Sequence, residues 1–60
     1  MNPTICLREI LDLFSEMHEL HPQDTRRYTC RVEVVDKLAI LGEYMITGGE
    51  PPELDQINVN

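Results

Sequence analysis

The stretch HELHPQDTRR, residues 18–27, divides the chain into two segments with different apolar patterns. Pro22 disfavours helical geometry at the preceding residue and has no N–H to donate, so a helix that reaches this point ends here. Asp24 or Thr25 then offers a side-chain oxygen that suits the start of a new helix. A connection this short usually joins antiparallel neighbours. The stretch therefore predicts a turn over residues 21–24 between two helices that lie side by side.

The segment before the turn predicts a helix over residues 3–20. Asn2 can cap its first turn, and Pro3 suits the first helical position, where its missing N–H costs nothing. At about 100° per residue, the apolar side chains cover roughly half of the helix circumference. These side chains are Cys6, Leu7, Ile10, Leu11, Leu13, Phe14 and Met17. The opposite side is charged, which is typical of an amphipathic helix.

The segment after the turn, residues 25–47, is ambiguous. Apolar and polar residues alternate between positions 28 and 34, which favours a strand. The run from Asp36 to Met45 lacks this alternation and contains good helix formers. We predict one continuous helix over residues 25–47, with a strand followed by a short helix as the alternative.

A continuous second helix would carry two adjoining apolar stripes. One consists of Val34, Leu38, Leu41 and Met45, and the other of Tyr28, Val32, Val35, Ala39 and Ile46. The first helix can cover only one of them, and an exposed apolar patch usually marks an interaction surface, although valines and isoleucines also occur singly on protein surfaces. A symmetric dimer of hairpins would cover both stripes as a four-helix bundle.

The predicted fold is therefore all-α: an antiparallel helical hairpin over residues 1–47 that dimerises into a four-helix bundle. The glycines at 48 and 49 end the second helix, and two prolines and several acidic residues predict an extended, flexible acidic tail over residues 48–60. The predicted helix–helix contacts, within and between chains, are Ile10, Phe14, Met17, Val34, Leu38, Leu41 and Met45.

Size and charge restrict the class of protein. A chain of 60 residues forms one domain, and at this size a lone chain buries only about 60% of its unfolded surface, which favours oligomers. The formal net charge of −6 disfavours nucleic acid and membrane surfaces as general partners. Arg26, Arg27 and Arg31 form a local basic cluster, which indicates contact with nucleic acid or with an acidic partner as a minority alternative.

No constellation of residues predicts catalysis, a metal or a cofactor. His18 and His21 are three positions apart, not the four that a zinc-protease helix needs. In an antiparallel hairpin Cys6 and Cys30 would lie on the order of 20 Å apart, too far for a disulfide. Too few cysteines for a secreted framework and no signal-peptide pattern predict a cytoplasmic protein, and no apolar run is long enough to span a membrane.

The run from Arg31 to Met45 includes DKLAILGEYM, in which charged residues lead into an apolar pattern and then a leucine–glycine step and a methionine. It resembles a helical segment of phage terminase small subunits. The resemblance implies a helical oligomerisation element of a viral DNA-packaging protein.

Together these features predict a small acidic, non-catalytic protein-interaction or regulatory module that self-associates through apolar helix faces. The alternative is a phage or mobile-element protein, either a terminase-small-subunit-like oligomerisation element or a nucleic-acid-associated regulator that uses Arg26, Arg27 and Arg31. Replacing Leu38 by aspartate is expected to dissociate or unfold the protein, because it places an unpaired charge in an apolar stripe.

Overall fold

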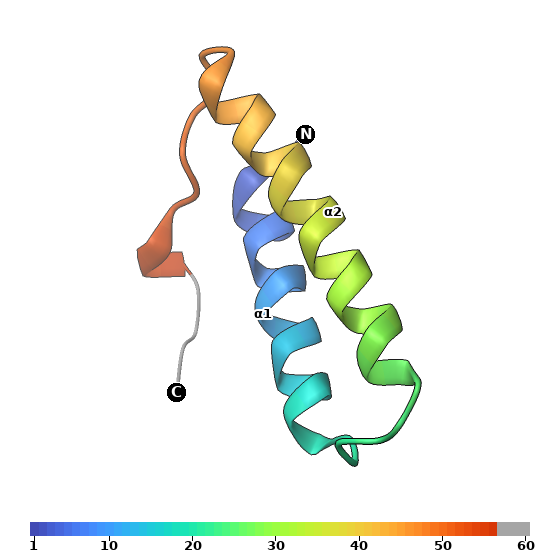
Figure 1. The fold of residues 1–60 in the computed structure, drawn as a ribbon. Coiled ribbons are helices and arrows are strands. Elements are labelled where there is room, and N and C mark those ends of the chain that lie inside the picture. The colour runs from blue at the N-terminus through green and yellow to red at the C-terminus, as the bar shows by residue number, and fades with distance from the viewer. Residues whose placement is uncertain (57–60) are drawn as a thin grey trace.

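The computed structural model describes residues 1–56 and consists of two α-helices and one short 3-10 helix. Helix α1 spans Pro3–Glu19, helix α2 spans Arg26–Ile46 and the 3-10 helix η1 spans Leu54–Gln56. The two long helices pack along each other as an antiparallel hairpin (Figure 1). The predicted all-α hairpin is confirmed, and the continuous α2 excludes the alternative in which residues 28–34 form a strand.

Helix α1 begins at the predicted cap. The side-chain oxygen Oδ1 of Asn2 accepts hydrogen bonds from the backbone N–H groups of Thr4 at 3.0 Å and Ile5 at 3.2 Å. Pro3 follows as the first helical residue. The cap satisfies two backbone donors that have no partner within the helix.

The connection between the helices is organised by Asp24. Thr25 precedes the first residue of α2, yet its side chain makes no capping hydrogen bond. Instead, Oδ1 of Asp24 accepts a hydrogen bond of 2.9 Å from the backbone N–H of Arg26, and its carboxylate pairs with the guanidinium group of Arg26 at 3.1 Å. Of the two predicted caps, Asp24 is therefore the one that acts.

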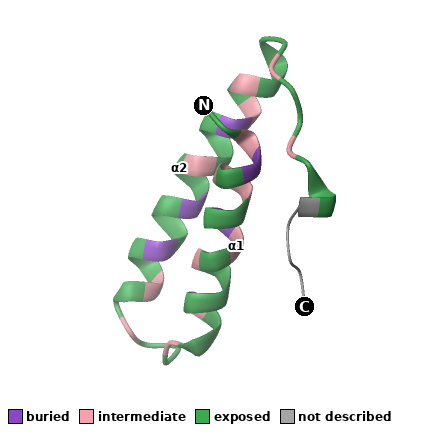
Figure 2. Cartoon of the chain, turned by 180° about the vertical axis from the view of Figure 1, so that it is seen from behind, coloured by how far each residue is buried: buried purple, intermediate pink, exposed green. Residues whose placement is uncertain are grey.

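The core of the hairpin is small. Ile10 of α1 packs with Val34 and Leu41 of α2, and these three side chains are almost completely buried. Around them lie three partly buried side chains, Cys6, Leu7 and Leu13. The core therefore forms a single seam between the two helices (Figure 2).

The chain after α2 turns back along α1. Gly48 has a φ of 97°, a left-handed conformation that favours glycine and ends the helix. The backbone N–H of Glu53 then donates a hydrogen bond of 2.9 Å to the hydroxyl oxygen of Thr4, which is buried. Helix α1 thus lies between α2 and this returning segment (Figure 1). The last four residues of the predicted tail, 57–60, lie outside the described residues.

Candidate interaction surface

The hairpin has two broad faces, and the position of a residue relative to the buried seam decides which face it joins. A residue four positions after a seam residue is rotated by about 40° in one sense, and a residue three positions after it by about 60° in the other. Reversing a helix reverses the apparent sense of rotation, and α2 also meets the seam from the opposite side. These two reversals cancel. In both helices, residues four positions after a seam residue (its four-step neighbours) therefore lie on one broad face of the hairpin. Residues three positions after a seam residue (its three-step neighbours) lie on the other.

The first broad face is apolar. Phe14 lies four positions after Ile10, and Leu38 lies four positions after Val34. Met45 follows the third seam residue, Leu41, by the same step. All three four-step neighbours are exposed, with 49% for Phe14, 46% for Leu38 and 42% for Met45. Together with two flanking side chains they form what is here termed the apolar face: Leu11, Phe14, Val35, Leu38 and Met45.

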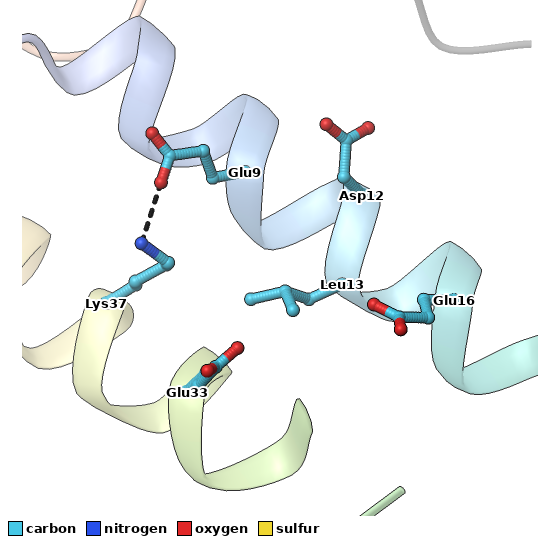
Figure 3. A pocket seen from close by; sticks show the side chains of 6 residues that line it. All are labelled: Glu9, Asp12, Leu13, Glu16, Glu33 and Lys37. Atoms are coloured by element: carbon cyan, nitrogen blue, oxygen red, sulfur yellow. Dashed lines mark hydrogen bonds and ion pairs between the residues drawn. The ribbon is translucent and has the colours of Figure 1, made fainter. Parts of the chain in front are cut away.

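The second broad face is acidic. Leu13 and Lys37 are three-step neighbours of Ile10 and Val34, and they line a hollow with four carboxylate side chains. This acidic face consists of Glu9, Asp12, Leu13, Glu16, Glu33 and Lys37. Figure 3 shows Leu13 pointing from α1 toward α2, with Lys37 bound to Glu9 across the gap. The face carries a net negative charge, because it has four carboxylates and one ammonium group.

The predicted contact residues divide into two groups. The buried seam between the two helices is formed by Ile10, Val34 and Leu41. Phe14, Leu38 and Met45 lie on the apolar face and are each nearly half exposed, while Met17 is half-buried. The sequence pattern did not separate these roles, because both groups repeat at helical spacing.

The three predicted arginines also have different surroundings. Arg26 is paired with Asp24, and its hydrogen bonds lower the pKa of that carboxyl group below its ordinary value. Arg27 and Arg31 line a hollow at the loop end of the hairpin together with Tyr28. They lie seven and three positions before Val34, so both stand at the loop end of the apolar face.

The structure places the two cysteines and His21 in different local environments. Cys6 and Cys30 are free thiols, and burial raises the pKa of Cys30, which disfavours its nucleophilic thiolate form. The Nδ1 atom of His21 accepts a hydrogen bond from the backbone N–H of Gln23. Among residues 1–56, no group of three or more His, Cys, Asp or Glu side chains could hold a metal ion.

No helix within the described part of the chain combines the length and apolar character that crossing a bilayer requires. Comparisons of the chain with protein-family models, with curated proteins and with solved structures found no match.

Proposed function

We propose that this chain is a small acidic, non-catalytic protein-interaction module that self-associates through its apolar face. The observation that carries the proposal is the thickness of the hairpin. The principal extents of the chain are 39 × 24 × 12 Å, and the shortest matches the diameter of a single helix, about 10–12 Å. Stable domains are built from two or more packed layers. A single layer of two helices buries the side chains between the helices, so the apolar side chains on a broad face stay partly exposed.

Of the two broad faces, the apolar face is the one whose burial against another molecule would stabilise the protein. Fully burying a large apolar side chain stabilises a protein by about 1.5–3 kcal/mol relative to leaving it exposed, and Phe14, Leu38 and Met45 are each nearly half exposed. A second copy presents the same patch, so a two-fold dimer pairs the patch with itself and adds the missing layer. The product is a four-helix bundle whose acidic faces point outward and keep the dimer in solution.

The same surface accommodates the phage-related alternative. The terminase-like run from Arg31 to Met45 lies within α2 and includes Leu38 of the apolar face. A nucleic-acid-associated regulator would instead use the loop end, where Tyr28 and two arginines line one hollow. An aromatic ring with basic side chains in the same hollow suits a stacked base of single-stranded nucleic acid. The overall charge of −6 places this alternative second.

The test is the mass of the protein in solution, measured by light scattering over a wide range of concentration. Leu38 and Ile40 form a matched pair on α2, because their exposed fractions are 46% and 48%. Leu38 lies on the apolar face, whereas Ile40, three positions after Lys37, lies on the acidic side. We expect a dimer for the wild-type chain and for Ile40→Asp, and a monomer or an unfolded chain for Leu38→Asp.

Circular dichroism on the same samples distinguishes dissociation from unfolding. If the wild-type chain is a folded monomer at all concentrations, or if both variants keep the dimeric mass, the apolar face is not an assembly surface and the proposal fails.

A further inference from the structure

We infer that the hollow at the loop end of the hairpin binds a single nucleotide, with its phosphate on Arg27 and Arg31 and its base on the ring of Tyr28. This loop-end hollow is lined by Pro22, Gln23, Asp24, Arg27, Tyr28 and Arg31. All six residues come from one chain, so the inference goes beyond the proposed self-association and does not depend on it.

Arg27 and Arg31 differ from the other basic residues of the protein in their surroundings. Lys37 and Arg26 each pair with a carboxylate of the same chain, and Arg8 lines a different hollow near the start of α1. Within residues 1–56, the structure gives the side chains of Arg27 and Arg31 no ion pair or hydrogen bond. Two guanidinium groups in the same hollow are therefore available to an anion.

The carboxylate of the loop-end hollow does not neutralise these two arginines. Asp24 accepts a hydrogen bond of 2.9 Å from the backbone N–H of Arg26 and pairs with the guanidinium group of the same residue at 3.1 Å. The next two backbone N–H groups, of Arg27 and Tyr28, donate to carbonyl oxygens of Asp24 and Thr25. The side chains of the hollow, and not the backbone at the start of α2, are thus the groups that would hold a ligand.

The position of Arg27 in α2 favours an anion as the ligand. Arg27 lies in the first turn of the helix, which contains no acidic residue, and a cation there is opposed by the helix dipole. Arg31 follows one turn later, about 6 Å along the axis, and adds a second positive charge. A phosphate group suits this pair, because its oxygens accept two parallel hydrogen bonds from the planar fork of an arginine.

Tyr28 adds an aromatic surface to the same hollow. It follows Arg27 directly in the chain and is 71% exposed. The bases of nucleic acids stack on exposed aromatic rings of this kind, and stacking tolerates any base because every base has a flat face. A ligand that uses both the arginines and the ring carries a phosphate and a planar ring together, as a nucleotide does.

Charge limits the ligand to one nucleotide. The two arginines span a single helical turn, whereas the protein as a whole carries a formal net charge of −6. A nucleic-acid strand would place its further phosphates over a surface that repels them. A mononucleotide confines its charge to the hollow.

Titration of the wild-type chain at low ionic strength, followed by nuclear magnetic resonance, tests the inference. The probes are adenosine 5′-monophosphate, adenosine and inorganic phosphate. We expect saturable shifts at Arg27, Tyr28 and Arg31 and tighter binding of the monophosphate than of the other two. No saturable shift at these residues overturns the inference, and so does a monophosphate that binds no more tightly than adenosine or phosphate.

Variants separate the hollow from the total charge. Arg31→Gln should weaken binding of the monophosphate about three- to tenfold, because a charge-assisted hydrogen bond is lost. Arg8→Gln makes the same change in net charge outside the hollow and should weaken binding less. Tyr28→Ala should lower the affinity for the monophosphate to that for inorganic phosphate, and circular dichroism checks that each variant is folded. Equal effects of the two arginine variants, or no effect of Tyr28→Ala, overturn the inference.

A short single strand of adenylate distinguishes one nucleotide from nucleic acid. We expect it to bind no more tightly than the monophosphate, because its additional phosphates meet no further basic side chain of the hollow. A strand that binds more tightly overturns the limit to one nucleotide and supports the nucleic-acid alternative instead.

Discussion

The Nζ atom of Lys37 lies 2.7 Å from the Oε2 atom of Glu9, and this ion pair joins α2 to α1 at the edge of the acidic face. Glu9 precedes the seam residue Ile10 by one position, and Lys37 follows the seam residue Val34 by three. The pair therefore spans the seam on the acidic side, while the apolar face on the other side carries no comparable link in the described structure.

The first prediction concerns the pH dependence of this pair. The pKa of Lys37 is raised above its ordinary value of 10.5, chiefly because its ammonium group donates a hydrogen bond to Glu9. A raised pKa stabilises the folded chain fully below the unfolded pKa, and this contribution disappears as the pH rises through the folded pKa. We expect Lys37→Met to lower the melting temperature at pH 8, and this difference from wild type to shrink above about pH 10.5. A difference that stays constant across this range would contradict the assignment.

The second prediction concerns the core. Ile10 is only 2% exposed, whereas Ile5 on the same helix is 49% exposed. Ile10→Ala should lower the free energy of unfolding by about 2–5 kcal/mol, because it removes buried apolar contacts and leaves a cavity. Ile5→Ala makes the same chemical change and should cost less than about 1 kcal/mol. Urea unfolding followed by circular dichroism measures both, and Ile10→Val, at about 0.5–1.5 kcal/mol, remains informative if the alanine variant unfolds. Equal losses at Ile10 and Ile5 would place the core elsewhere.

The third prediction concerns the start of α1. Asn2→Ala removes the oxygen that accepts hydrogen bonds from Thr4 and Ile5, and should lower the free energy of unfolding by about 1 kcal/mol. Asn2→Asp keeps an accepting oxygen and adds a negative charge that suits a helix N-terminus, so it should retain wild-type stability or exceed it. The same unfolding measurement applies. If the aspartate variant were as unstable as the alanine variant, the capping role would be refuted.

The fourth prediction concerns the segment that returns along α1. Thr4→Val keeps the shape of the side chain and removes the hydroxyl oxygen that accepts from Glu53. We expect faster hydrogen exchange at the backbone amide of Glu53, measured by nuclear magnetic resonance, because this N–H loses its acceptor. Thr29→Val is the control, since Thr29 is an exposed residue of α2. Unchanged exchange at Glu53 in the Thr4 variant would mean that the segment is not held by this contact.

Much of the fold could be predicted from local signals. Asn2 and Pro3 mark the start of α1, Pro22 marks the break and Gly48 marks the end of α2, each through a backbone property of its own residue. The choice between strand and helix at residues 28–34 was harder. Apolar and polar residues alternate there over only a few positions, which is a short local pattern. The helix is stabilised instead by the burial of Cys30 and Val34 against α1, which a local pattern does not contain.

The candidate surface was only partly predictable. Helical spacing predicted contact roles for Phe14, Leu38 and Met45, but it did not distinguish them from the residues of the buried seam. Whether a residue lies in the seam or on the apolar face depends on the rotation of each helix about its own axis. This rotation is set by how α1 and α2 pack. The ion pair between Lys37 and Glu9 also depends on this rotation, and no local sequence signal indicated it.

The sequence by itself determined two amphipathic helices, the turn between them and the acidic charge, because these depend on residues close together in the chain. Only the tertiary structure decided that one broad face of the hairpin is apolar and the other acidic, and that Thr4 holds the segment containing Glu53. The physical reason is that a helix pattern defines angles around one axis. Which of those angles meets a neighbour, and which meets water, is decided only when the axes pack together.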